Sequence, residues 1–175
     1  MLVFYENRTM AILEILKYPD PRLRIKAQPV TTIDAELRRM IDDMYETMYA
    51  AQGVGLAATQ VNIHKQIFTL DVSETRDQKL CILNPEIVSK EGTQYEAEGC
   101  LSVDGGAFDK IERAQKVVLR GMDLDGKIRE WVAEGLMASC FQHEIDHLNG
   151  ILFIDHLSRL KQDRIRKKIE KSRQK

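Results

Sequence analysis

The sequence keeps its helical segments apart from its strand-like segments, and this separation constrains the fold most strongly. Apolar residues recur at helical spacing over 34–51, and four β-rich runs follow before the next helical segment. The runs are 66–72, 80–89, 117–123 and 127–133. Asp125-Gly126, between the last two runs, is a strong hairpin signal. Helices that do not alternate with strands predict an α+β domain with antiparallel sheets rather than a parallel α/β fold.

The expected helices have clear ends. Asp34 and Glu36 stand in the first turn of the first helix, and Gly53 lies just past its end. The second helix covers 136–148, where Asn149-Gly150 should end it. A third helix is expected in the tail, 158–175. Its narrow apolar stripe consists of Leu157, Leu160, Ile165 and Ile169.

Length and composition favour one cytoplasmic domain. A chain of 175 residues fits a single domain, expected to span 1–175. Met10 opens a second plausible start, so residues 1–9 are interpreted as an extra N-terminal tail. No apolar run approaches the roughly 20 residues of a membrane span, and the first ten residues do not resemble a secretory signal. Three cysteines without an export signal are expected to stay reduced.

The charge is distributed unevenly. Residues 158–175 hold nine Lys/Arg and two Asp/Glu, a charge of +7, which leaves −8 for the rest of a chain whose total is −1. The simplest interpretation is a solvated basic helix packed on the body. The alternative is attraction to a polyanion such as the ribosome surface. No sequence-specific nucleic-acid site is expected.

Residues 143–147 read His-Glu-Ile-Asp-His and carry the chemistry. Positions i and i+4 of a helix share one face, so His143 and His147 can bind one divalent metal ion. Glu144 would lie beside that ion, where a carboxylate can accept a proton from an activated water. A solvated surface helix with two histidines that bind no metal would have the same sequence pattern. The rest of the sequence is therefore needed to choose between the two interpretations.

A catalytic metal needs a third protein ligand and an open position. Position 153, where a third histidine would fall, is Phe, which disfavours the usual protease layouts. Cys100 lies in the glycine-flanked stretch Glu98-Gly-Cys-Leu-Ser102 and is the best candidate. Cys140 shares the helical face of His143 and could compete for the role. It is interpreted instead as part of a pocket wall, because free cysteine is commonly buried as a small hydrophobe.

The other cysteine and the remaining histidines have simpler interpretations. Cys81 is assigned to the core, and His64 and His156 to surface or structural positions.

Three segments together resemble the peptide deformylases, which remove the formyl group from the initiator methionine of new bacterial polypeptides. They are Gly53-Val-Gly-Leu-Ala-Ala-Thr-Gln60, Glu98-Gly-Cys-Leu-Ser102 and His143-Glu-Ile-Asp-His-Leu-Asn-Gly150. The resemblance implies an α+β deformylase-like domain with antiparallel sheets around the central H-E-x-x-H helix and a helical C-terminal tail. It also implies a metal-dependent amide hydrolase that takes N-formylmethionyl peptides and releases formate.

Residue by residue, the resemblance implies a metal site of Cys100, His143 and His147, with Glu144 as the acid/base. Gln60 and the backbone N–H of Leu101 would hold the oxyanion. The implied ion is Fe(II), with zinc, nickel or cobalt as alternatives that the same donors suit. The residues expected to bind substrate are Gly53, Val54, Gly55, Gly99, Leu136, Ser139 and Cys140.

The sequence departs from the family pattern in two places. Asp104 replaces a usual proline, and one residue is inserted before Arg113, so the 103–111 stretch is expected to be an atypical loop in which Phe108 packs over the pocket. Glu96 and Ser139 replace usually apolar pocket residues. A specialised or low-activity deformylase is therefore one alternative. A module with a structural four-ligand metal site, completed by Cys140 or His156, is another.

Overall fold

The computed structural model describes residues 11–174, so the expected tail at 1–9 lies outside the described residues. Three α-helices and seven strands form the described part, together with three short 3₁₀ turns. The α-helices are α1 (Ala35–Ala50), α2 (Gly135–Leu148) and α3 (Arg159–Arg173). The 3₁₀ turns are η1 (Pro21–Arg24), η2 (Ala58–Val61) and η3 (Phe153–His156).

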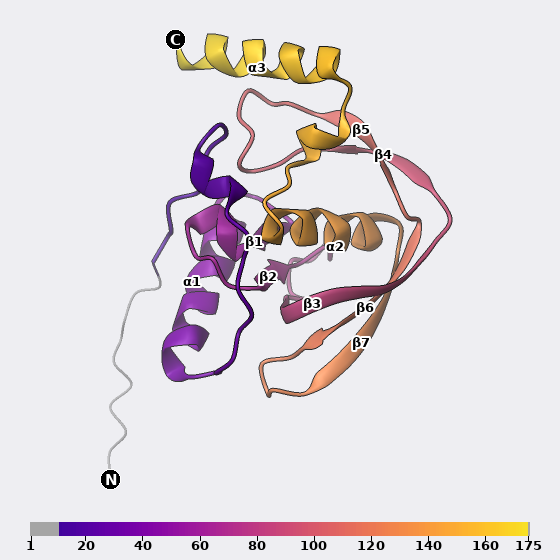
Figure 1. Ribbon diagram of the computed structural model, residues 1–175. Coiled ribbons are helices and arrows are strands. Elements are labelled where there is room, and N and C mark those ends of the chain that lie inside the picture. The colour runs from indigo at the N-terminus through magenta and orange to yellow at the C-terminus, as the bar shows by residue number, and fades with distance from the viewer. Residues whose placement is uncertain (1–10, 175) are drawn as a thin grey trace.

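The strands form two antiparallel sheets, which confirms the α+β prediction. The larger sheet has the order β1-β2-β3-β6-β7, and β4 pairs with β5 in a separate hairpin. The strands are β1 (Gly55–Ala57), β2 (Ile67–Leu70), β3 (Leu80–Glu91), β4 (Gln94–Glu98), β5 (Asp109–Arg113), β6 (Lys116–Met122) and β7 (Ile128–Glu134). Figure 1 shows α2 between the large sheet and the β4–β5 hairpin.

The sequence predicted β2, β3, β6 and β7 with ends that agree with the structure to within a few residues. It did not predict β1, β4 or β5. The sequence Gln94-Tyr-Glu-Ala-Glu98 of β4 and Asp109-Lys-Ile-Glu-Arg113 of β5 are too polar to show a buried face. The interpretation of 103–111 as a loop is therefore wrong at its end, because residues 109–111 belong to β5. Hydrogen bonding between the two strands compensates for the weak apolar pattern.

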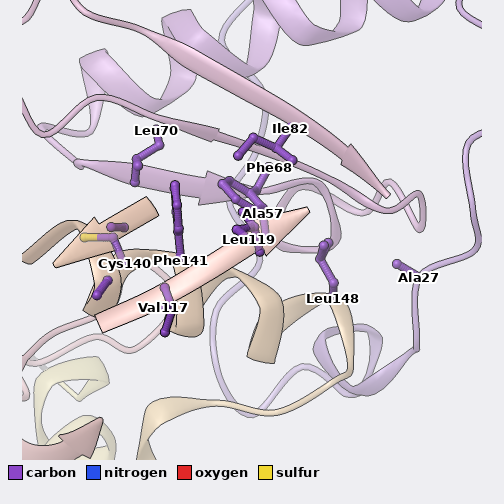
Figure 2. Close-up of a cluster of buried hydrophobic side chains, with 12 residues drawn as sticks. Ala27, Ala57, Phe68, Leu70, Ile82, Val117, Leu119, Cys140, Phe141 and Leu148 are labelled. Carbon is purple, nitrogen blue, oxygen red and sulfur yellow. The ribbon is translucent and has the colours of Figure 1, made fainter. Parts of the chain in front are cut away.

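The large sheet is covered by a helix on each face, and the alternation of side chains along its strands assigns the faces. Phe68 and Ile82 point to α2, where they pack with Phe141 (Figure 2). Ile67 and Leu83 point the other way, into a cluster with the buried face of α1. Burial on both faces fixes the sheet and thereby fixes α2.

The predicted helix ends agree with the structure. The Asp34 side chain caps α1 by accepting a hydrogen bond from the N–H of Leu37 at 2.8 Å. Asn149 caps the C-terminus of α2, and Gly150 follows with a φ of 75°, a conformation that favours glycine. A side chain on Gly150 would also meet the Arg24 carbonyl oxygen at 2.5 Å.

The tail helix α3 packs on the body through a third buried cluster. Ile165 and Ile169 lie in it beside Leu16, Leu23 and Val103. Leu160 was predicted in the apolar stripe but is 63% exposed, so the stripe is narrower than predicted. Among residues 11–174, no helix combines the length and the apolar character needed to cross a membrane.

Candidate active site

Cys100, His143 and His147 come together as the sequence predicted. The helix α2 presents both histidines on one face, and the turn after β4 brings Cys100 to them. His147 Nε2 lies 3.1 Å from His143 Nε2 and 3.2 Å from Cys100 Sγ. The three donor atoms all lie within 4.8 Å of one another, and Cys140 is not part of the group.

These spacings fit a shared metal ion. Ligands of one tetrahedral ion, at about 2.0 Å for nitrogen and about 2.3 Å for sulfur, lie roughly 3.3 to 3.6 Å apart. The observed separations of 3.1 and 3.2 Å are close to that range. The donor chemistry also fits, because a thiolate with two imidazoles is a transition-metal ligand set. Cys100, His143 and His147 therefore have the spacing and the donor atoms of a metal-binding site.

A buried ion-pair network orients His143. Its Nδ1 lies 2.9 Å from Glu98 Oε2, which leaves Nε2 to face the other ligands. Arg113 donates to both carboxylate oxygens of Glu98 at 2.8 and 3.0 Å and to Asp146 at 2.7 Å. Burial opposes ionisation of Glu98, but the hydrogen bonds from His143 and Arg113 lower its pKa to about 2. No local pattern in the sequence links Arg113 to the site, because its partners are distant along the chain.

Glu144 lies beside the ligands and is 4% exposed. Its Oε2 has no hydrogen-bond partner among the described residues. Burial raises its pKa to about 7, so the carboxyl group can both accept and return a proton near neutral pH. Gly55 makes room for it: a side chain there would place Cβ 2.3 Å from Glu144 Oε1.

Gln60 is buried with its side-chain amide held in one orientation. Its Oε1 accepts a hydrogen bond from the N–H of Ala57 at 2.9 Å, and its Nε2 donates to Ser102 Oγ at 3.0 Å. The same Nε2 lies 3.7 Å from Cys100 Sγ, so the amide faces the metal site. The Leu101 carbonyl accepts from Lys17 Nζ at 2.6 Å, while the Leu101 N–H donates to no residue in the range 11–174.

A cavity of about 350 Å³ opens beside the metal site. Its lining contains all seven residues predicted to bind substrate: Gly53, Val54, Gly55, Gly99, Leu136, Ser139 and Cys140. Gln60, Cys100, Leu101, His143 and Glu144 also line it. Gln52 and Ala97 were not singled out in the sequence, because neither carries a chemical signal of its own.

Phe108 reaches the same cavity from the atypical loop. Its side chain is 69% exposed, and a Cβ added at Gly99 would lie 2.4 Å from its ring. The ring therefore packs against the Gly99 backbone, next to Cys100. Gly105 and Gly106, with φ values of 78° and 58°, form the turn before it.

The remaining candidate residues have structural positions. Cys140 belongs to the cavity wall, where burial raises the pKa of its thiol to about 12, and Cys81 is buried in the core. His156 Nε2 lies 2.7 Å from Asp146 Oδ2 and is not one of the three possible metal ligands. His64 is not one of the three ligands. Within the described chain, neither proposed fourth ligand completes a closed site.

Two of the three possible metal ligands, Cys100 and His143, line one cavity together with the buried carboxyl group of Glu144, and this combination defines a metal-dependent hydrolase. The model of the polypeptide deformylase family matches residues 12–163. The chain is thus a member of that family.

Relatives and solved structures agree with this assignment. The peptide deformylase of Azotobacter vinelandii is 57% identical over 164 residues, which cover 93% of this chain and 96% of that protein. Peptide deformylase 1 of Pseudomonas syringae pv. tomato is 56% identical with the same coverage. The crystal structure of a peptide deformylase from Legionella pneumophila superposes with a TM-score of 0.90 at 48% identity, covering 94% of this chain and 96% of that one. The chain is a metal-dependent peptide deformylase.

Proposed function

We propose that this deformylase hydrolyses the N-terminal formyl group of N-formylmethionyl nascent polypeptides, giving formate and a free amino terminus. The observation that carries the proposal is the convergence of three possible metal ligands beside buried Glu144, which lines the cavity. The family membership supports the same substrate class.

Cys100, His143 and His147 would hold one divalent ion, and Fe(II) is the ion we propose. Sulfur and nitrogen donors also suit zinc, nickel and cobalt, so these are the alternatives for the isolated protein. When bound, such an ion supplies Lewis-acid activation of water and of the formyl oxygen. The Glu98–Arg113 pair keeps His143 turned toward this position.

Glu144 is the proposed acid/base. Its buried carboxylate takes a proton from the attacking water, and the carboxyl group then gives a proton to the departing amine nitrogen. The pKa of about 7 suits both steps near neutral pH. The reaction breaks the formyl carbon–nitrogen bond.

Gln60 and the backbone N–H of Leu101 are the proposed oxyanion donors. The Gln60 amide is held by Ala57 and Ser102 before substrate arrives, so little reorganisation is needed. One such donor is typically worth about 3 to 4 kcal/mol of barrier.

The cavity lining is the proposed substrate site. The backbone around Gly53, Val54 and Gly55 would align the peptide, and Gly99 would leave room for it on the opposite side. Leu136, Ser139 and Cys140 would contact the first side chain. We further propose that residues 1–175 act as one domain. The first two buried clusters share β1, β2 and β3, and the Arg113–Asp146 ion pair joins β5, which carries Ile111 of the third cluster, to α2.

The deciding experiment is formate release from a formyl-Met peptide by anaerobically prepared Fe(II) protein and by its Glu144→Gln variant. We expect the variant to retain the metal and to lose about 10²- to 10⁴-fold in kcat. The Glu91→Gln variant, altered at an exposed position outside the cavity, should match the wild type. Formate release that survives Glu144→Gln would contradict the assignment of the base. Metal binding without any formate release would favour the structural-metal alternative, and internal peptide cleavage would favour an endoprotease.

We also propose that the protein works in the cytoplasm, where nascent formylated chains are made, and touches the ribosome surface through α3. Arg164, Lys167 and Lys171 recur at helical spacing and are exposed, whereas Ile165 and Ile169 face the body. Reversing these three charges to Glu should weaken ribosome cosedimentation. The matched triple reversal of Lys26, Lys65 and Lys127 should not. Association that survives the first variant, or that is insensitive to salt, would contradict the proposal.

A further inference from the structure

The cavity wall between β4 and α2 carries a carboxylate that the proposed reaction does not use. Gln94, Glu96 and Glu98 alternate along β4 and therefore share one face of the strand. The side chains of the two outer residues reach α2: Gln94 Nε2 donates to Ser139 Oγ at 3.0 Å, and Glu98 Oε2 lies 2.9 Å from His143 Nδ1. Glu96 stands between them on the same face.

The contacts on the opposite face of β4 agree with this orientation of the Glu96 side chain. Tyr95 lies opposite Glu112 in the strand register, and its hydroxyl donates to the Glu112 carboxylate at 2.5 Å. The side chain of Glu96 therefore points away from that pair and toward the segment of α2 between Ser139 and His143. Glu96 and Ser139 both line the cavity.

Glu96 also differs from its neighbour Glu98 in charge pairing. Glu98 is 9% exposed and neutralised by Arg113, whose remaining nitrogen is taken by Asp146. Glu96 is exposed, and within residues 11–174 its carboxylate has no ion-pair or hydrogen-bond partner. It is a free negative charge on the wall of an otherwise largely apolar pocket.

The place of Glu96 along α2 follows from the contacts of its two neighbours. Gln94 contacts Ser139 and Glu98 contacts His143. These two positions of α2 are about 6 Å apart along the helix, at about 1.5 Å per residue, and Glu96 lies between them. A substrate whose formyl group lies at the metal ligands extends its first side chain along this wall, past Ser139 and Cys140. A long side chain ending in a cation would bring its charge to the Glu96 carboxylate.

We propose that Glu96 is a specificity-determining residue that raises the activity toward formylated peptides whose first side chain ends in a cation, relative to the activity toward peptides with an apolar side chain of the same shape. The inference rests on the proposed deformylase function. Ser139 supports it, since a hydroxyl group in the wall tolerates a polar chain better than an aliphatic residue would.

The test compares formyl-Lys and formyl-norleucine peptides that are otherwise identical, because lysine is norleucine with an added terminal amine. The quantity measured is the ratio of their kcat/KM values. We expect Glu96→Gln to lower the lysine-to-norleucine ratio about two- to fivefold, the range typical of a solvent-accessible ion pair. In the wild type the ratio should also fall as salt rises, whereas in Glu96→Gln it should not.

The matched control is Glu91→Gln, which removes an equal charge from an exposed position on β3 outside the cavity. An unchanged ratio in Glu96→Gln, or an equal change in Glu91→Gln, would overturn the inference. Formate release from a formyl-Met peptide is measured alongside. Its absence in the wild type would refute the proposed function, whereas its presence with an unmoved ratio would refute only the role of Glu96.

Discussion

At the scale of single residues, the site combines groups whose roles follow from local pattern with groups that only the fold brings in. The helical spacing of His143 and His147 and the glycine before Cys100 indicated the candidate metal ligands from the sequence. Phe108 was also expected at the pocket from the sequence, and it lines the cavity just after the turn at Gly105 and Gly106. Arg113 is different, because only the fold brings it to Glu98 and Asp146.

Phe108 leads to a prediction about substrate affinity. Its exposed ring lies against Gly99 and offers one free face to the cavity, so a bound peptide would cover it. We expect Phe108→Ala to raise KM for formyl-Met peptides about three- to tenfold, since covering part of an aromatic ring is worth about 1 kcal/mol. The kcat should change little.

Steady-state formate kinetics would check this expectation, with Tyr95→Ala as the control. Tyr95 is also an exposed aromatic residue, but it points to the other face of β4. An unchanged KM in Phe108→Ala would show that the ring does not contact the substrate.

At the scale of elements, a buried ion-pair network joins α2 to the β4–β5 hairpin. Arg113 on β5 joins Glu98 on β4 to Asp146 on α2. We expect Arg113→Gln to lower the free energy of unfolding by about 3 to 5 kcal/mol, because it leaves Glu98 buried without its cation. Arg120→Gln, which breaks the exposed pair with Glu130, should cost about 1 kcal/mol or less. Urea unfolding at equal metal content measures both, and similar losses would contradict the expectation.

The ion pair between Glu98 and Arg113 should also affect how the free energy of unfolding depends on pH. The pKa of Glu98 is about 2 in the folded protein, below its ordinary value of 4.5. Its contribution is therefore fully present above about pH 4.5 and is lost as the pH falls toward 2. The stability difference between wild type and Glu98→Gln should shrink within that window and stay constant above it.

The elements also show which parts of the fold were predictable. The helix α1 and strands β2, β3, β6 and β7 have buried faces, and the period of their apolar residues revealed them. The β4–β5 hairpin lacks that signal, because it is stabilised by strand pairing and by the contacts of Gln94 and Glu98 with α2. The Glu98–Arg113 pair joins residues whose spacing carries no local pattern, so only the structure could reveal it.

At the scale of the whole molecule, α3 holds distant parts of the chain together. Its buried residues Ile165 and Ile169 pack against the N-terminal segment and the 103–107 loop. Lys161 pairs with Asp109 at 2.7 Å, and Lys168 donates to the Gly106 carbonyl at 3.0 Å. The tail is therefore more than a solvated charge carrier.

The contribution of this packing to stability can be measured by comparing two substitutions on α3. We expect Ile169→Ala to destabilise the protein by about 2 to 4 kcal/mol, as for other buried Ile-to-Ala changes. Leu160→Ala, on the exposed side of the same helix, should change stability by about 0.5 kcal/mol or less. Thermal or urea unfolding distinguishes the two, and equal effects would place Leu160 in the apolar stripe after all.

The contacts of α3 with Asp109 and Gly106 fasten the stretch that carries Phe108. No residue of α3 lines the cavity itself among the described residues. A substitution on α3 can therefore reach the substrate through Phe108 while leaving every metal ligand in place.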